Sequence, residues 1–115
     1  MSLNKGDVVL VQFPFTDLSQ AKLRPALIIY SNPVTNEVTL CFISSQNINK
    51  LTSEEFTIKD SDADFAYTGL RISSKVRVTR ITTLNKSLIL RRLGKLSDDY
   101  IEILNTILKE AFQLP

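Results

Sequence analysis

The 115-residue chain is 43% hydrophobic and 23% charged, with a formal net charge of +2, which is typical of an ordinary soluble globular protein. The length predicts one domain over residues 1–115, and the absence of a ~20-residue apolar run or a signal-peptide pattern predicts no membrane partner. A single cysteine cannot form an internal disulfide, so we expect a reducing cytoplasmic location. With no histidine, one cysteine and three glycines, the chain excludes histidine-dependent hydrolases and glycine-rich phosphate loops and argues against a zinc site, so we expect neither metal nor cofactor.

Two predicted strands and the loop between them open the chain. Asp7–Phe13 is expected to form the first strand and Pro25–Ser31 the second, which ends at the turn Asn32–Pro33. The polar loop Pro14–Leu23 is long for so small a domain, and we expect it to gate a binding groove. Arg24 stands at the start of the second strand, where its permanently charged guanidinium offers an anion site. A surface arginine beside a strand-starting proline is the alternative interpretation.

The middle of the chain reads as short strands and polar loops. Glu37–Ser44 predicts a third strand, Ser45–Lys50 a loop and Glu54–Lys59 an edge strand. Cys41 lies in the apolar run of the third strand and is expected to be a small core residue. The acidic run Asp60–Asp64 lacks the glycine and the glutamate that a calcium loop needs, so we interpret it as a solvated loop.

The next strand is predicted by alternation. Valines alternate with polar side chains in Lys75–Ile81, which places Arg77 and Thr79 on a common face. The alternation changes phase at Arg80–Ile81, and this change predicts a bulge or bend.

A turn at Asn85–Ser87 leads to a last predicted strand, Leu88–Leu93, and the chain ends in a predicted helix. Ser97 is a good N-cap residue, and two aspartates follow it where the helix dipole favours negative charge. One apolar stripe then repeats at helical spacing, through Ile101, Leu104, Leu108 and Ala111. The fold class is therefore mainly β with α, a small and strongly curved sheet or barrel with a C-terminal helix against it.

Charge is unevenly distributed along the chain. Residues 71–95 contain lysines and arginines but no acidic residue, whereas residues 54–64 are mostly acidic among their charged positions. A stretch of one charge sign on strands is what a polyanion-binding face requires. A solvated surface balanced by the acidic segment is the alternative interpretation.

The side chains that remain for chemistry are arginines and hydroxyls. This set suits recognition of phosphate groups, or cleavage of a phosphodiester whose nucleophile the substrate supplies. RNA carries such a nucleophile, the 2′-hydroxyl. Positioning that group and stabilising the charge of the transition state can provide much of the rate.

Five segments, in order along nearly the whole chain, resemble the MazF/PemK family of toxins from bacterial type II toxin–antitoxin systems. They are Gly6–Val11, Arg24–Ile29, Phe42–Gln46, Val76–Asn85 and Leu93–Ser97. The resemblance implies a compact SH3-like β-barrel, a homodimer, and metal-independent endoribonuclease activity on single-stranded RNA through attack of the 2′-hydroxyl. It also implies a cognate antitoxin whose acidic C-terminal segment lies across the RNA groove.

The resemblance assigns site residues as well. The family's catalytic arginine falls on Arg24 and its catalytic threonine on Ser44, where serine keeps the hydroxyl but loses the methyl that restricts the rotamer. A strand-end serine that caps a turn is the alternative for Ser44. The expected RNA-binding residues are Lys22, Gln46, Arg77, Thr79 and Arg80.

The chain departs from the family near Arg77. In some members an aspartate follows this arginine by two positions, and here Thr79 replaces it. The glutamine and arginine that often come next become Arg80 and Thr82. Without that carboxylate or a histidine, the sequence identifies no general base.

Two other functions stay open from the sequence. A degenerate member could bind RNA or its antitoxin without cleavage, which Thr79 and Thr82 favour. A gyrase inhibitor is the second alternative, because the related CcdB toxins share the fold, although the Arg-Pro and Ser-Ser-Gln motifs favour the ribonuclease. The RNA sequence that is cleaved, the antitoxin and the dimer surface do not follow from the sequence.

Overall fold

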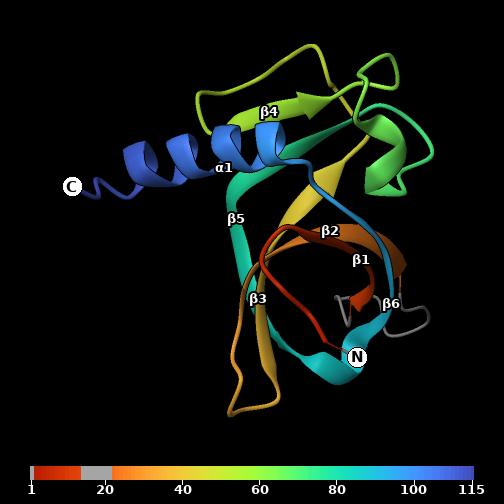
Figure 1. Cartoon of the computed structure of the whole chain (residues 1–115), viewed down its shortest axis with the longest axis vertical. Coiled ribbons are helices and arrows are strands. Elements are labelled where there is room, and N and C mark those ends of the chain that lie inside the picture. Colours follow the sequence, from red (N-terminus) through yellow and green to blue (C-terminus); the bar gives the residue numbers. More distant parts are fainter. Residues whose placement is uncertain (1, 14–21) are drawn as a thin grey trace.

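The computed structural model describes residues 2–13 and 22–115, and within them six strands form one antiparallel sheet (Figure 1). The strands are β1 (Asp7–Phe13), β2 (Lys22–Ser31), β3 (Glu37–Ser44), β4 (Glu55–Ile58), β5 (Ser74–Asn85) and β6 (Ile89–Lys95). Their order across the sheet is β4-β5-β3-β2-β1-β6. Two short 3-10 helices precede β5 and β6, and an α-helix ends the chain: η1 (Phe65–Thr68), η2 (Lys86–Leu88) and α1 (Asp98–Ala111).

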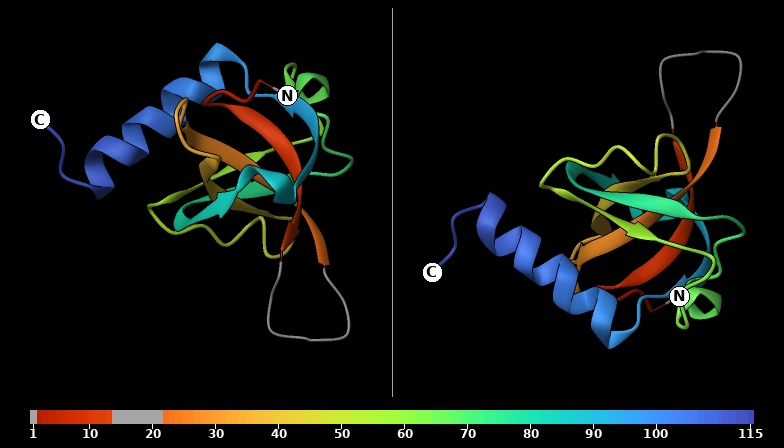
Figure 2. Two further views of the ribbon diagram at one scale, coloured as in Figure 1. Left: turned by 90° about the horizontal axis from the view of Figure 1, so that it is seen from below. Right: turned by 90° about the horizontal axis from the view of Figure 1, so that it is seen from above.

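The predicted fold class, mainly β with α, is confirmed, but the sheet is not a closed barrel. The sheet coils strongly (Figure 2), yet its two edges, β4 and β6, do not pair with each other in the described part of the chain. Residues 14–21 of the predicted gating loop lie outside the described residues. The last two residues of that predicted loop belong to β2, where Lys22 is opposite Phe13.

Each face of the sheet carries an apolar cluster, because successive side chains of a strand point to opposite sides. One cluster includes Val8, Leu27, Cys41 and Val76, and the buried side of α1 packs on it. The prediction that Cys41 is a core residue is confirmed. The opposite face carries the neighbours of these residues in the chain, among them Val9, Ala26 and Leu40, with Phe42 packed against them.

The terminal helix begins where the sequence predicts. The Ser97 hydroxyl accepts a hydrogen bond from the Tyr100 amide (3.4 Å), and Asp98 and Asp99 occupy the first turn. The helix lies beside β4 and β5, and its C-terminal end extends past the sheet (Figure 2). No helix in the described ranges is long and apolar enough to cross a membrane.

Strand β5 contains the irregularity that the change of phase predicts. Phe42 on β3 is opposite Arg77, whereas the preceding residue, Cys41, is opposite Ile81. Residues 78–80 therefore bulge out of the pairing with β3, which bends β5. As a result, the first part of β5 pairs with both β3 and β4, and the second part pairs with β3 alone.

Two glycines let η1 approach β6 closely. A Cβ atom at Gly94 would overlap the backbone carbonyl groups of Tyr67 and Thr68. Gly69 has φ +72°, and a Cβ atom there would overlap the Leu93 carbonyl. This contact places the segment after η1 beside β6, where both line the cavity described next.

Candidate RNA-binding and catalytic site

A cavity of about 810 Å³ lies where the adjoining ends of β1, β2 and β3 meet β6 and the segment after η1. Its described lining contains five cationic side chains and no acidic one. The polar lining residues are Lys22, Arg24, Ser44, Ser45, Gln46, Arg71, Ser74, Arg77 and Arg91. A concave surface with charges of one sign attracts an anionic ligand.

Strand register explains why Arg24 and Ser44 reach the same cavity. Ala26 on β2 is opposite Phe42 on β3. Arg24 precedes Ala26 by two residues and Ser44 follows Phe42 by two, so in this antiparallel pair both lie toward the same end. Because side chains alternate along a strand, both also point to the face that Ala26 and Phe42 share.

The charge on Arg24 is available to a ligand. Its side chain is exposed and lines the cavity, and none of the ion pairs within the described ranges includes it. A guanidinium offers five N–H donors in a planar fork that matches two oxygens of a phosphate group.

Ser44 has a structural contact that is compatible with a chemical role. Its hydroxyl oxygen accepts a hydrogen bond from the Gln46 amide (3.1 Å), which is the turn-capping arrangement considered from the sequence. A hydroxyl also has one hydrogen to donate. The Gln46 contact therefore orients the oxygen and leaves the O–H group able to donate to a phosphate oxygen.

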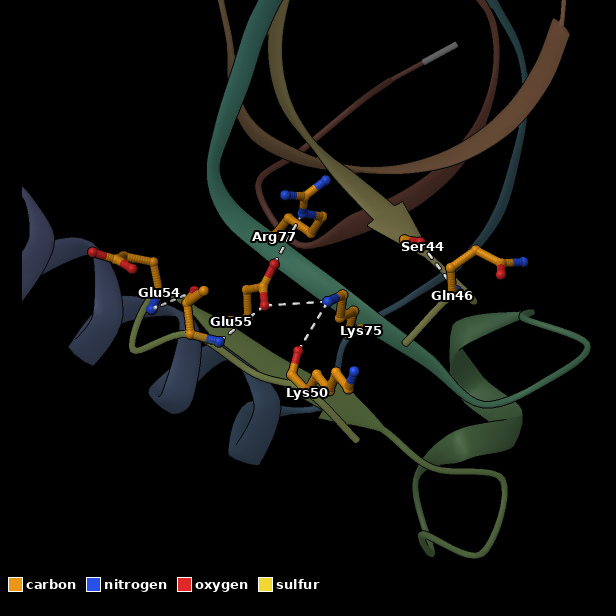
Figure 3. Close-up of polar contacts among 8 residues, drawn as sticks. Ser44, Gln46, Lys50, Glu54, Glu55, Lys75 and Arg77 are labelled. Atoms are coloured by element: carbon orange, nitrogen blue, oxygen red, sulfur yellow. Dashed lines mark hydrogen bonds and ion pairs between the residues drawn. The ribbon is translucent and has the colours of Figure 1, made fainter. Parts of the chain in front are cut away.

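The same row of the sheet continues from Phe42 to Arg77 on β5 and then to Glu55 on β4. Figure 3 shows the resulting ion pair, in which Arg77 Nε donates to Glu55 Oε2 (2.9 Å). The Glu55 carboxylate also accepts from Lys75 Nζ (3.3 Å) and from the Thr52 amide (3.0 Å). Burial favours the neutral acid, but these donors outweigh it and hold the pKa of Glu55 below its ordinary value of 4.5.

The structure separates the predicted site residues into two groups. Lys22, Arg24, Ser44, Gln46 and Arg77 line the cavity. Thr79 and Arg80 are exposed within the β5 bulge and do not line it.

Sequence reasoning did not single out Arg71, Arg91 or Glu55. The uninterrupted basic run was the available signal for the two arginines, because both fall within it. Glu55 had no comparable signal, since its contact with Arg77 depends on β4 pairing with β5.

Neither a metal-binding cluster nor a reactive thiol is found in the described part of the chain. No cluster of three or more histidine, cysteine, aspartate or glutamate residues is placed to hold a metal ion within residues 2–13 and 22–115. Burial raises the pKa of the Cys41 thiol to about 12, so this side chain is not a nucleophile in the folded protein.

Comparison with known proteins finds one matching sequence family and several similar folds. The sequence model of one family, described as PemK-like, MazF-like toxin of type II toxin-antitoxin system, matches residues 4–112. No curated protein matches the chain.

Several solved structures share the fold. One is an endoribonuclease in complex with its cognate antitoxin from Mycobacterial species (TM-score 0.72, 22% identity, 99% of this chain and 98% of that chain). A second is the Mycobacterium tuberculosis toxin MazF-mt6 (TM-score 0.73, 21% identity, 95% and 98%). A third is MazF from Deinococcus radiodurans (TM-score 0.71, 22% identity, 96% of each chain).

Proposed function

Because the chain belongs to the family of PemK-like, MazF-like toxins of type II toxin–antitoxin systems, we propose that it cleaves single-stranded RNA as a metal-independent endoribonuclease. The observation that supports this proposal is the cavity that Arg24 and Ser44 both line at one end of the β2–β3 pair. Four further cationic side chains line the described part of that cavity. This lining suits a substrate that brings its own nucleophile on a polyanionic backbone.

In the proposed reaction the RNA 2′-hydroxyl oxygen attacks the adjacent phosphorus atom. The new O–P bond replaces the bond to the 5′ oxygen. The 2′-hydroxyl gives up its proton and the departing 5′ oxygen takes one up, which leaves a 2′,3′-cyclic phosphate and a 5′-hydroxyl. Arg24 stabilises the negative charge that develops on the phosphorane, and Ser44 donates a hydrogen bond to a non-bridging oxygen. Both contributions are positioning and charge stabilisation, which arginines and hydroxyls supply without a metal.

The remaining lining residues hold the RNA in this proposal. Lys22, Gln46 and Arg77 contact it within the cavity, and the structure adds Arg71 and Arg91 as further cations. Thr79 and Arg80 lie outside the cavity, and we keep them as contacts to RNA that extends beyond it.

The proposed partners follow from the same surface. An antitoxin with an acidic, extended C-terminal segment complements a cavity lined by cations, and its binding would exclude RNA by occupying the same site. We also propose that the toxin acts as a homodimer. The homodimer is tested by measuring the mass of the protein in solution, with and without an acidic peptide. The antitoxin proposal is tested by measuring whether that peptide competes with RNA for binding.

One experiment distinguishes the proposed activity from its alternatives. Purified protein is incubated with a long single-stranded RNA in EDTA, and the ends of any fragments are identified. Fragments with cyclic phosphate ends support the proposal. Binding without cleavage identifies a degenerate RNA-binding member, and inhibition of supercoiling in a parallel assay identifies a gyrase inhibitor.

A further inference from the structure

The Glu55 carboxylate lies between two cationic side chains beside the cavity (Figure 3). Its side chain is 6% exposed, and its two oxygens accept from Arg77 Nε (2.9 Å) and Lys75 Nζ (3.3 Å). Glu55 is not among the residues that line the described cavity, whereas Arg77 is. Any influence of Glu55 on a ligand there therefore passes through its neighbours.

A second set of contacts connects this carboxylate to the segment that follows β3. Lys75, whose side chain is 10% exposed, donates to the Lys50 carbonyl (3.1 Å) as well as to Glu55. The Thr52 amide donates to the same carboxylate (3.0 Å). The segment from Ser45 to Thr52 is thus attached at its far end to β4 and β5, and its near end forms part of the cavity wall.

The contact with Arg77 leaves most of that guanidinium available. The Nε–H group is used by Glu55, and the four N–H donors on the two terminal nitrogens remain for a ligand. The side chain is 36% exposed, so it has a fixed inner end and an accessible outer end. A long arginine side chain loses rotamer freedom when it binds a ligand, and a side chain held beforehand loses less.

We propose that Glu55 is a positioning residue that holds the Arg77 guanidinium at the cavity wall and, through Lys75, holds the segment after β3. This inference rests on the proposed function, in which Arg77 binds the RNA backbone. Glu55 itself touches neither the RNA nor the reacting atoms.

Loss of the Glu55 charge and loss of its positioning role should change RNA affinity in opposite directions, so the direction of the change tests the proposal. Removing a carboxylate near a cationic cavity raises the local positive potential and should strengthen binding of a polyanion. Loss of positioning should instead weaken binding, because Arg77 is then no longer held. The direction of the change therefore decides between the two accounts.

The test compares Glu55→Gln with Glu54→Gln, which removes the same charge one residue away. The side chain of Glu54 makes no hydrogen bond or ion pair within the described part of the chain, and its carboxyl group points away from Arg77 and Lys75 (Figure 3). We expect Glu54→Gln to cleave RNA within about twofold of the unchanged protein, and Glu55→Gln about tenfold more slowly or worse. Affinity is measured with RNA that carries a 2′-deoxynucleotide at the scissile position, and Glu55→Gln should bind it more weakly than Glu54→Gln. Equal rates and affinities for the two variants would overturn the proposal.

A mutant cycle shows whether the effect passes through Arg77. Arg77→Ala is introduced into both backgrounds, and affinity for the uncleavable RNA is measured. In the Glu54→Gln background, we expect Arg77→Ala to cause its full loss of RNA affinity. In the Glu55→Gln background the additional loss should be much smaller, because the position of Arg77 is already disturbed there. Additive effects would mean that Glu55 does not act on RNA binding through Arg77 and would contradict the proposal.

Two measurements keep this inference separate from the proposed function. If the unchanged protein does not cleave RNA, the ribonuclease proposal fails, and the affinity cycle still decides the role of Glu55. If Glu55→Gln does not fold, exchange of the Arg77 Nε hydrogen is followed by NMR in the unchanged protein. Slower exchange than at exposed Arg80 supports the proposal, and equal exchange overturns it.

Discussion

Arg24 and Ser44 are brought together by register rather than by closeness in the chain. Each lies two residues beyond the Ala26–Phe42 pair, on the same face and toward the same end of the sheet. The chemistry proposed here needs only a fixed cation and a hydroxyl beside one phosphate. Both side chains are supplied by strands that are held by the apolar core behind them.

Replacement of Arg24 by alanine should remove the main stabilisation of the phosphorane. We expect Arg24→Ala to lower the cleavage rate by about 10²–10³-fold, the usual effect of losing one donor at a developing anion. The measurement is the initial rate with RNA in excess, at equal concentrations of folded protein. An unchanged rate would show that Arg24 does not take part in the reaction.

Arg77 and Arg80 provide a matched pair on one strand. Both replacements with alanine remove one positive charge from β5, but only Arg77 lines the cavity. Arg77→Ala should therefore weaken RNA binding by about 10–150-fold, since hydrogen bonds to charged groups are worth about 1.5–3 kcal/mol and each 1.4 kcal/mol is tenfold. Arg80→Ala should have a clearly smaller effect on RNA that fits within the cavity. A larger loss for Arg80→Ala would place the main RNA contact on the bulge instead.

The pairing of β4 with β5 depends on a charged contact as well as on backbone hydrogen bonds. Glu55 joins these strands, and its folded-state pKa lies below the ordinary value of 4.5. A lowered pKa means that the carboxylate adds stability above about pH 4.5, and that this contribution is lost as the pH falls through the folded-state value.

Denaturation of the unchanged protein and of Glu55→Gln across a pH series checks this expectation. The unchanged protein should have the larger free energy of unfolding near pH 7, and the difference should shrink as the solution becomes more acidic than about pH 4.5. A difference that stays constant down to about pH 2 would show that the stabilisation does not come from ionised Glu55.

Local patterns determine how much of each element could be predicted. Apolar runs bounded by turn residues, Gly6 before β1 and Asn36 before β3, gave these two strands their observed bounds, and Ser97 marked the start of α1. Strand β5 was predicted too short, as Lys75–Ile81 instead of Ser74–Asn85. Its bulge breaks the alternation, so the residues after the bulge did not continue the strand pattern. Helix η1 follows an acidic loop and is too short to show a periodicity.

The candidate site was predictable only where a motif marked it. Arg24 and Ser44 came from recognisable segments, and both line the cavity. Glu55 and Arg77 are 22 positions apart, and only the order of the strands makes them neighbours. The same limit applies to the barrel: several short strands with one terminal helix predict a small, curved sheet, but they do not show whether its two edge strands pair.

Across the whole molecule the net charge is only +2, but five cationic side chains and no acidic one line the described cavity. RNA binding should therefore weaken steeply as salt increases. Single-stranded RNA gives a log–log slope of roughly −0.7 for each phosphate contacted, so five such contacts give about −3.5. Titration of fluorescent RNA at several salt concentrations measures the slope, which Arg77→Ala should reduce by about 0.7. A flat response would contradict phosphate binding in the cavity.

Chemical labelling of Cys41 can report how often the folded core opens. This cysteine is the chain's sole thiol, it is fully buried on β3, and burial suppresses its ionisation. An alkylating reagent should therefore modify the protein only during rare excursions in which the core opens, so the labelling rate reports how often the native state is lost. Any partner that binds the folded chain alone will slow that labelling in proportion to its occupancy, which gives an affinity assay that requires neither substrate nor an engineered probe.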